Sequence, residues 1–248
     1  MRPTPLHLVL LAGGRGLRAG GGDGEPKQFR RTARGPLYTV SLRTFLDERP
    51  DAPWHLASLT ITAPEERHAP VAREVAAVLA DRRRGRPALP FQLAAPGATR
   101  TASTWHALRE LDTRLGPGPD DLVAVHDTAR PFASHDLLDA LARAALAAGG
   151  AVPGVPVPDT IVRSRADAGA EYLARAELVA VQTPQVFRWA GFFAAHAWAA
   201  AESLEFTDDG GLAAARGDAP AVVAGEAGNW KVTTDADWER AAARLAGD

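Results

Sequence analysis

LHLVLLAGGRGLRAGGGDGEPKQF, residues 6–29, joins a short apolar run to a glycine-rich loop. The run LHLVL has the length and composition of a buried β-strand. Glycine carries no side chain, so the backbone after this strand can approach a ligand closely. Backbone N–H groups in such a loop are suited to wrap phosphate oxygens. The stretch therefore favours a phosphate-bearing ligand at the end of the first strand, although a plain glycine-rich turn also fits it.

Short apolar runs recur along the chain and alternate with segments of helical spacing. The expected strands are 6–12, 55–62, 91–97, 121–127, 150–157 and 221–226, and the expected helices are 69–83, 101–115, 134–148, 189–204 and 235–247. Ser134 is a suitable N-cap and Gly149 a suitable stop for the third of these helices. This alternation predicts an α/β fold, a Rossmann-like and mostly parallel sheet flanked by helices. Ligands of such sheets bind at the carboxyl ends of the strands.

The alternation breaks between residues 152 and 180, where prolines are followed by extended segments. This stretch indicates a two-stranded arm instead of another strand–helix unit. An exposed arm of two strands needs a partner that covers it. We find no internal repeat and no linker composition. We therefore expect a single domain over residues 1–248, with a protruding β-arm at about 152–180.

The composition excludes several classes of function. The 248 residues carry a formal net charge of −2, so no basic field points to nucleic acid. No run approaches the ~18 apolar residues of a membrane span, and the N-terminus fits a strand better than a secretory signal. Cysteine is absent, which excludes disulfides and thiolate chemistry and suits a cytoplasmic protein.

The basic residues are distributed unevenly between lysine and arginine. Of the 28, two are lysine, Lys27 and Lys231, and the remaining 26 are arginine. A coding bias toward arginine explains the ratio, and chance could account for either surviving lysine. Both lysines nevertheless lie in motif-like surroundings, EPKQF and GNWKVTT. An ammonium is a compact point charge that a planar guanidinium does not replace, so these positions are candidates for chemistry.

Three nucleotide-binding interpretations compete for the first loop. Gly14, Gly16 and Ala19 match the dinucleotide fingerprint, but the acidic residue expected about 20 positions later is missing. A Walker A loop needs Gly-Lys-Ser/Thr, whereas Lys27 stands between proline and glutamine. The third is a nucleotidyltransferase loop, in which Arg18 and Lys27 reach the phosphate oxygens. The residues favour this third interpretation.

Two further loops follow expected strands. HDTARP, residues 126–131, offers Asp127 as an Mg²⁺ ligand and Arg130 as a bidentate phosphate ligand, or the two form a simple turn pair. His126 is more readily understood as a structural histidine than as a ligand. PGATRTAST, residues 96–104, places Arg100 and Ser103 where they can contact a nucleotide.

Taken together, seven motifs in a fixed order make a family resemblance. They are LAGGRGLR…PKQF, GATRTAST, HDTARP, PVPDTIVR, TPQVF, TDDG and NWKVTT. The set resembles the 2-C-methyl-D-erythritol 4-phosphate cytidylyltransferases of the methylerythritol phosphate route to isoprenoids. The resemblance extends from residue 7 to about residue 240.

The resemblance implies roles for individual residues. CTP is expected to contact Leu11, Ala12, Gly13, Gly14, Gly97, Arg100, Ser103 and Asp127. Catalytic roles fall to Arg18, Lys27, Arg175 and Lys231, and Asp127 takes the position that holds Mg²⁺ or another divalent cation. The polyol phosphate is expected to contact Arg130, Thr160, Thr183 and Thr207. Some of these contacts come from the neighbouring subunit's arm, so the resemblance implies a homodimer.

The implied reaction is the in-line attack of a phosphate oxygen on the α-phosphorus of CTP. A phosphate monoester is already anionic, so positioning and charge neutralisation suffice without a general base. Ala98 departs from the family pattern because some members carry an acid there. Alternatives are a cytidylyltransferase for another polyol phosphate such as ribitol 5-phosphate, and an inactive nucleotide-binding regulator. The missing acid and the PKQF motif disfavour a nicotinamide oxidoreductase.

Overall fold

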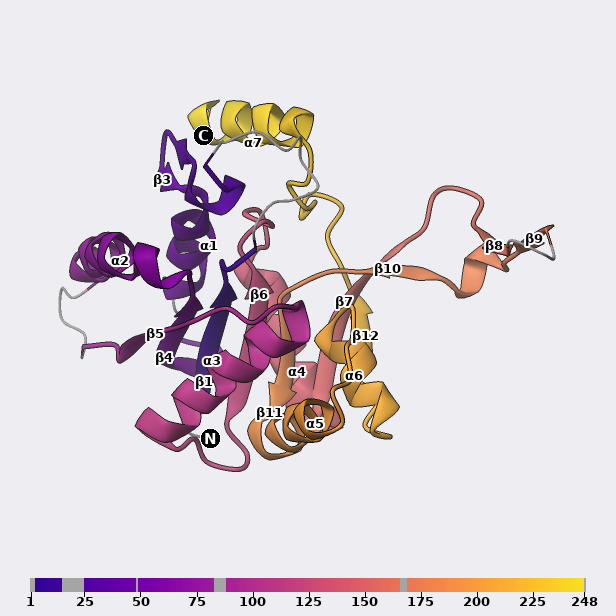
Figure 1. Ribbon diagram of the computed structural model, residues 1–248, viewed down its shortest axis with the longest axis horizontal. Helices are drawn as coiled ribbons and strands as arrows, with labels where there is room; N and C mark the ends of the chain where they lie inside the picture. Colours follow the sequence, from indigo (N-terminus) through magenta and orange to yellow (C-terminus); the bar gives the residue numbers. More distant parts are fainter. Residues whose placement is uncertain (1–2, 15–24, 48, 83–87, 166–168, 248) are drawn as a thin grey trace.

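The computed structural model describes residues 3–14, 25–47, 49–82, 88–165 and 169–247. Within them, a central sheet is covered by helices on both faces (Figure 1), with strand order β10-β7-β11-β6-β1-β4-β5 and β12 beside β7. Its strands are β1 Thr4–Leu11, β4 Trp54–Thr62, β5 Phe91–Ala94, β6 Leu122–Asp127, β7 Gly150–Pro156, β10 Val179–Val181, β11 Gln185–Arg188 and β12 Ala221–Ala224. Short pairs are formed by β2 Arg31–Thr32 with β3 Gly35–Pro36, and by β8 Val162–Arg165 with β9 Gly169–Tyr172.

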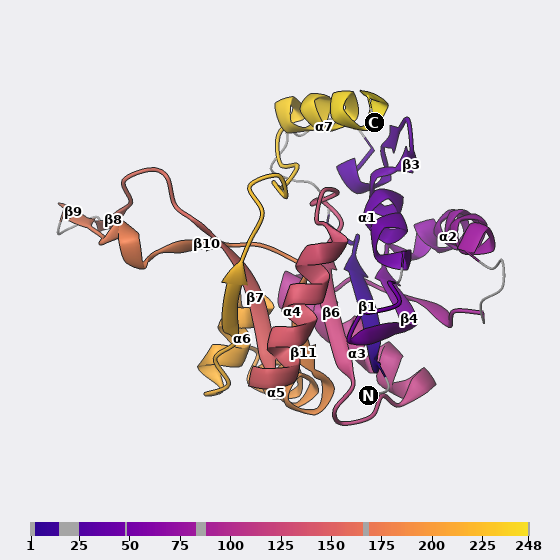
Figure 2. The ribbon, with the colours of Figure 1, turned by 180° about the vertical axis from the view of Figure 1, so that it is seen from behind.

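The helices cover the two faces because side chains alternate along the buried strands. The helices are α1 Leu37–Leu46, α2 His68–Arg82, α3 Arg100–Leu115, α4 His135–Ala148, α5 Trp189–Ala201, α6 Asp209–Ala215 and α7 Asp235–Gly247, with 3₁₀ turns η1 Lys27–Phe29, η2 Glu65–Arg67 and η3 Arg175–Glu177. Leu8 and Leu10 of β1 pack in one core with α1, α2 and α4. Val9 and its neighbours on β6 pack in the opposite core with α3, α5 and α6. Figure 1 shows α3 in front of the sheet, and Figure 2 shows α4 in front from the other side.

The order of the strands creates a switch point beside β1. From β1 the chain moves outward through β4 to β5 and then returns to β6 on the other side of β1. All three pairings, β1 with β4, β4 with β5 and β1 with β6, are parallel. Doubly wound sheets bind ligands at the carboxyl ends of the strands at such a point. The predicted Rossmann-like α/β fold is confirmed.

An arm projects from the body between β7 and β10 (Figures 1 and 2). Residues 152–156 and 179–180 of the predicted arm belong to the central sheet, so the projecting part is 157–178. The β8–β9 hairpin forms its tip, and Tyr172 on that hairpin is 75% exposed. No helix in the described part of the chain has both the length and the apolarity needed to cross a membrane.

Most predicted elements are found within a few residues of their expected bounds. Ser134 caps α4, its hydroxyl accepting from Leu137 N, and Gly149 ends that helix with φ 87°. Helices α1 and α6, strand β11, the short strands β2 and β3 and the 3₁₀ turns were not predicted. Helix α1 is short, is buried nearly all round and contains Thr39 and Val40, so its helix propensity is weak. Helix α6 is seven residues long and contains two glycines.

Candidate nucleotide site

The parallel register brings the ends of four strands to one edge of the sheet. Leu11 at the end of β1 is aligned with Asp127 of β6 on one side and Thr62 of β4 on the other. Thr62 is in turn aligned with Ala94 of β5. The loops after β1, β5 and β6 therefore begin side by side, as the sequence predicted for the carboxyl edge.

The first loop starts in a fixed conformation. Ala12 N donates to both oxygens of Thr62, at 3.1 Å to the carbonyl and 3.2 Å to the hydroxyl. The buried side-chain amide of Gln28 donates to Ala12 O at 2.9 Å and to Gly14 O at 2.6 Å. In the sequence, Gln28 served only as evidence that the loop is not a Walker A loop. Its role in fixing the loop was not predicted, although Gln28 is part of the PKQF motif. Arg18, predicted to be catalytic, lies outside the described residues.

Gly13 is required by packing against the second loop. A Cβ at Gly13 would lie 2.2 Å from Pro96 Cβ, whereas a Cβ at Gly14 would meet no atom of the described residues within 4 Å. The first two loops are therefore in direct contact at Gly13. This arrangement leaves the exposed Gly14 backbone available to a ligand.

The second loop leads into the N-terminus of α3. Thr99 is the N-cap and accepts from Ala102 N at 3.2 Å. Ser103 Oγ accepts from Gly97 N at 3.0 Å and donates to Thr99 O at 2.8 Å. The predicted ligand residues Gly97 and Ser103 thus shape the loop itself. A helix N-terminus at this place also favours negatively charged groups.

We expect Gly97→Ala to destabilise the protein by about 1–3 kcal/mol, the usual cost of overpacking. Its Cβ would lie 2.4 Å from Ala102 Cβ and 2.9 Å from Ser103 N, and the latter is backbone that cannot give way. Gly14→Ala is the matched control because its Cβ would contact no atom within 4 Å in the part of the chain that the structure describes. Thermal unfolding of both variants measures the difference, and equal melting temperatures would contradict the assigned packing.

Asp127 is held by two cations at the end of β6. Arg100 Nε lies 3.3 Å from one carboxylate oxygen, Oδ1, and Lys231 Nζ lies 2.6 Å from the other, Oδ2. Burial opposes the charge of this carboxyl, yet Arg100 and Lys231 outweigh burial and hold the pKa of Asp127 well below its usual range. The backbone N–H of Asp127 donates to Thr183 Oγ1 at 3.0 Å. Asp127 is therefore ionised and fixed in place.

The two lysines of the chain meet at the same segment. Lys27 Nζ donates to the carbonyl oxygen of Thr233, and Lys231 two residues earlier reaches Asp127. Val232 N between them donates to Ala129 O at 2.8 Å, which ties the segment to the loop after β6. The structure thus brings together two residues that composition alone had singled out, although they are about 200 positions apart in the sequence.

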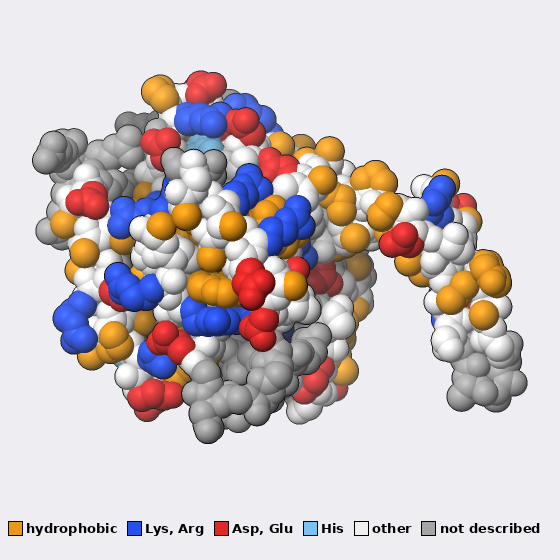
Figure 3. Space-filling model, turned by 90° about the horizontal axis from the view of Figure 1, so that it is seen from above, with side chains coloured by type: hydrophobic (Ala, Val, Ile, Leu, Met, Phe, Trp, Pro, Cys, Tyr) orange, Lys and Arg blue, Asp and Glu red, His pale blue; other side chains and the backbone are white. Residues whose placement is uncertain are grey.

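Helix α7 lies over this segment and anchors it. The Trp230 ring lies 4.4 Å from the Phe132 ring, and the Arg240 guanidinium lies 3.9 Å from the centroid of the indole. Asp237 accepts hydrogen bonds from Thr233 N and Thr233 Oγ1, at 2.9 and 2.8 Å. Figure 3 looks down on the α7 end of the molecule and shows basic and acidic side chains interspersed among the described residues.

Two of the predicted substrate residues lie next to Asp127. Thr183 is buried, and its hydroxyl bonds to the Asp127 backbone and lies 3.2 Å from His126 Nδ1. Arg130 Nη1 donates to Asn229 O at 2.9 Å, and its buried Nε has no hydrogen-bond partner among the described residues. Burial lowers the pKa of Arg130. Arg100 Nη2 and Asn229 Oδ1 are likewise buried without a hydrogen-bond partner among the described residues, so several polar atoms beside Asp127 are left without one.

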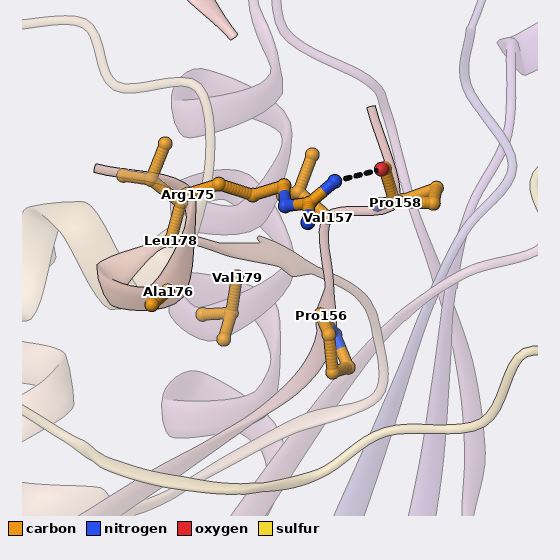
Figure 4. A pocket seen from close by; sticks show the side chains of 7 residues that line it. All are labelled: Pro156, Val157, Pro158, Arg175, Ala176, Leu178 and Val179. Carbon is orange, nitrogen blue, oxygen red and sulfur yellow. Dashed lines mark hydrogen bonds between the residues drawn. The ribbon is translucent and has the colours of Figure 1, made fainter. Parts of the chain in front are cut away.

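The remaining predicted residues lie elsewhere. Thr160 and Arg175 are exposed on the projecting arm, away from the carboxyl edge (Figure 1). Figure 4 shows Arg175 Nη1 donating to Pro158 O at 2.6 Å, beside a pocket of about 600 Å³ at the base of the arm. Thr207 is exposed and follows Phe206, whose backbone N–H and carbonyl both bond to Thr101 Oγ1. A single chain therefore does not bring Thr160 and Arg175 to the edge of the sheet.

His126 is fully buried beneath the site, as a structural histidine would be. Its Nε2 lies 3.0 Å from Arg130 O and 3.3 Å from Ser41 Oγ. Burial lowers the pKa of His126 from 6.5 to about 4. The side chain therefore stays neutral in the folded protein at a pH where it is protonated in the unfolded chain.

We expect acid to destabilise the protein through His126. The unfolded chain binds a proton below about pH 6.5 and the folded protein does not until about pH 4. Stability is thus fully present above pH 6.5 and falls by roughly 2–3 kcal/mol as the pH approaches 4. Urea unfolding at pH 7 and pH 4.5, in EDTA, measures the loss. His126→Gln should be less stable than wild type at pH 7 and should lose less stability than wild type between pH 7 and pH 4.5. An equal loss of stability in both proteins would contradict the assignment.

The fold and the site define a nucleotide-binding α/β protein with a glycine-rich loop at its switch point and a cation-paired carboxylate beside it. The model of the 2-C-methyl-D-erythritol 4-phosphate cytidylyltransferase (IspD) family matches residues 6–246. The chain therefore belongs to this family of nucleotidyltransferase enzymes.

Individual relatives agree with the family. The chain is 36% identical over 238 residues to the 2-C-methyl-D-erythritol 4-phosphate cytidylyltransferase of Salinibacter ruber, covering 96% of this chain and 92% of that one. It is 35% identical over 240 residues to the bifunctional enzyme IspD/IspF of Rhizobium rhizogenes, covering 95% of this chain but 55% of the relative. The chain thus spans about half the length of such bifunctional relatives.

A solved structure of a family member also aligns with this chain. The 2-C-methyl-D-erythritol 4-phosphate cytidylyltransferase from Thermus thermophilus aligns with a TM-score of 0.68 at 30% identity, over 98% of this chain and 99% of that one.

Proposed function

We propose that this chain transfers CMP from CTP to 2-C-methyl-D-erythritol 4-phosphate, releasing pyrophosphate, in the synthesis of isoprenoid precursors. Residues 1–248 act as one cytidylyltransferase domain. Membership of the family supports the reaction, and one observation connects it to this chain's own residues. Lys27, Lys231 and Asp127 converge at the carboxyl edge of the sheet, next to the glycine-rich loop.

The nucleotide lies along the first two loops in this proposal. In this placement the nucleotide is lined by Leu11, Ala12, Gly13 and Gly14, together with Gly97, Arg100 and Ser103. The fixed start of the first loop and the N-terminus of α3 support this placement. Preformed loops lower the entropy lost on binding, so they favour a single orientation of the nucleotide.

The chain supplies charge and position to the transfer step. The phosphate of the acceptor attacks the α-phosphorus, a P–O bond forms, and the bond to pyrophosphate breaks. Negative charge then grows on the leaving pyrophosphate, and the ammonium groups of Lys27 and Lys231 neutralise it together with Arg18. The acceptor phosphate needs no deprotonation, so the step requires no general base.

The reaction is proposed to depend on Mg²⁺ or another divalent cation, and the donor set fits one. Mg²⁺ is commonly held by one or two carboxylates together with substrate phosphates. Asp127 is ionised, 13% exposed, and already carries a cationic Lys231 on its outer oxygen, Oδ2. No group of three acidic or histidine side chains suited to a metal occurs among the described residues, so the phosphates must complete the set. Bound there, the cation neutralises the triphosphate.

The polyol phosphate is proposed to lie between two copies of the chain. Arg130, Thr183 and Thr207 come from one copy, and Thr160 and Arg175 from the arm of the other. The arm supports this because it projects away from its own site and exposes Val162 and Tyr172, which a second copy would cover. The homodimer and the choice of polyol rest on this argument.

Pyrophosphate release with a panel of phosphorylated polyols tests the proposal. The purified protein with CTP and Mg²⁺ should turn over 2-C-methyl-D-erythritol 4-phosphate at least tenfold faster than ribitol 5-phosphate. The reverse order would assign the chain to another polyol. CTP binding without release from any acceptor would indicate a nucleotide-binding regulator.

A further inference from the structure

The segment that carries Lys231 begins at a fully buried amide. Asn229 stands two residues before Lys231 in the GNWKVTT motif and is 0% exposed. Its Nδ2 donates to Thr183 O at 2.9 Å, whereas its Oδ1 has no hydrogen-bond partner among the described residues. A buried amide that is only partly satisfied costs stability, so stability alone does not explain Asn229. The reaction described above gives it no role.

A second buried amide holds the same segment. Gln182 is 6% exposed, and its Nε2 donates to the carbonyl oxygens of Glu226 and Asn229, at 2.8 and 3.3 Å. Its Oε1 accepts from Glu226 N at 3.1 Å and from Asn229 Nδ2 at 3.4 Å. The side chain of Gln182 therefore binds both ends of the stretch 226–229.

Thr183 connects both members of the Lys231–Asp127 ion pair to one residue. Its Oγ1 accepts from Asp127 N at 3.0 Å, and its carbonyl oxygen accepts from Asn229. Lys231 Nζ in turn lies 2.6 Å from Asp127 Oδ2. Two residues of extended chain span at most about 7 Å, so the position of Asn229 limits where the backbone of Lys231 can lie.

Lys231 needs this support because its side chain is long and flexible. The side chain is 43% exposed, and fixing a lysine in one rotamer costs conformational entropy. Val232 N, on the far side of Lys231, is bound to Ala129 O, and Asn229 supplies the restraint on the near side. With the near restraint removed, the backbone of Lys231 can swing about the far one, and the ammonium moves with it.

We propose that Asn229, supported by Gln182, is a positioning residue that aligns the ammonium of Lys231 at the site. The proposal rests on the proposed function, in which Lys231 neutralises charge on the leaving pyrophosphate. A cation that acts on charge developing in the transition state must be in place beforehand, so its misalignment lowers kcat more than it weakens ground-state binding. A misplacement of about 1 Å can lower the rate about 100-fold.

Asn229→Ala tests the proposal, and the scarcity of lysine supplies a probe. Protein labelled with ¹³Cε-lysine gives NMR signals from two lysines, Lys27 and Lys231, which Lys27→Arg assigns. A fixed lysine has two Hε protons with different chemical shifts, and free rotation averages them. In the protein without substrates, we expect the two Hε shifts of Lys231 to merge in Asn229→Ala. The Lys27 signals should stay unchanged, because its partner Thr233 is held separately by Asp237.

The kinetic effect should separate kcat from KM. We expect kcat of Asn229→Ala to fall about 10–100-fold while the KM for CTP changes less than threefold. The loss follows from the misaligned ammonium of Lys231, whereas the loops that bind CTP are untouched. Steady-state pyrophosphate release measures both constants.

Two further variants complete the test. Ser58→Ala is the control for a lost buried hydrogen bond elsewhere, because Ser58 on β4 is 0% exposed and bonds to His7 Nδ1 at 2.8 Å. It should lower the melting temperature and leave kcat and the Lys231 signals unchanged. Gln182→Met nearly conserves volume and removes the second amide, so it keeps the test decisive if Asn229→Ala fails to fold. It should also merge the two Hε shifts of Lys231.

Distinct Hε shifts retained for Lys231 in either folded variant would overturn the proposal. An equal loss of kcat in Ser58→Ala, at the same loss of melting temperature, would overturn it too, because the effect would then follow stability. Failure of CMP transfer by the wild-type protein concerns the proposed function, because the lysine signals are recorded without substrates.

Discussion

Lys27→Ala is expected to lower kcat about 1,000-fold while the Kd for CTP rises less than tenfold, because an aligned charge counts most where charge develops in the transition state. The side chain is oriented in the folded protein, since its Nζ donates to the Thr233 carbonyl next to Lys231. Binding of CTP in the ground state depends mainly on the backbone of two loops, so the Kd for CTP changes less than kcat. Single-turnover pyrophosphate release measures the change in the rate of transfer, and calorimetric titration with CTP measures the change in Kd.

Two variants sharpen the interpretation of Lys27→Ala. Lys27→Arg keeps the charge but replaces a compact ammonium by a wide fork, so it should also lose most of its turnover. Arg31→Ala is the surface control, because that side chain is 70% exposed and pairs with Glu74 outside the site. Normal turnover in Lys27→Ala would remove Lys27 from the catalytic residues. A loss confined to CTP affinity would reassign it to binding.

The fold was largely predictable because its buried strands and amphipathic helices follow simple periodicities. Strand β6 is apolar from Leu122 to Val125, and helix α4 has a cap, an apolar face and a glycine stop. Helix α1 was not predicted because it is ten residues long and contains residues of weak helix propensity, and packing on nearly all sides stabilises it. The pairing of β11 with β6 and β7 also depends on long-range contacts that no local pattern encodes.

The candidate site was predictable where a residue type carries the chemistry. Lysine scarcity pointed to Lys27 and Lys231, and the structure places both at one segment. Gln28 and Asn229 were missed because they act on other protein groups, the backbone carbonyls of the first loop and of Thr183. Such roles depend on three-dimensional proximity and leave no spacing in the sequence.

Asp127→Asn is expected to lower kcat at least 1,000-fold, since it removes the carboxylate that fits the metal and the partner of Lys231. It should also destabilise the fold by about 1–3 kcal/mol through the lost charge-assisted contacts, with the exposed Lys231 pair contributing the smaller part. The pKa of Asp127 is lowered in the folded state, so its contribution is present above the unfolded pKa and is lost as the pH falls through the folded pKa. The variant should therefore lose less stability than wild type in strong acid.

Asp120→Asn provides the matched control for Asp127→Asn, because Asp120 precedes β6 at its opposite end. Its carboxylate is 82% exposed and pairs with Arg188 on the surface. Exposed pairs of this kind contribute about 0–1 kcal/mol, so both turnover and urea midpoint should stay close to wild type. If Asp127→Asn keeps wild-type turnover at saturating Mg²⁺, the metal is held elsewhere. If it loses turnover but keeps its stability between pH 7 and pH 3, the two cations at Asp127 contribute to the site without stabilising the fold.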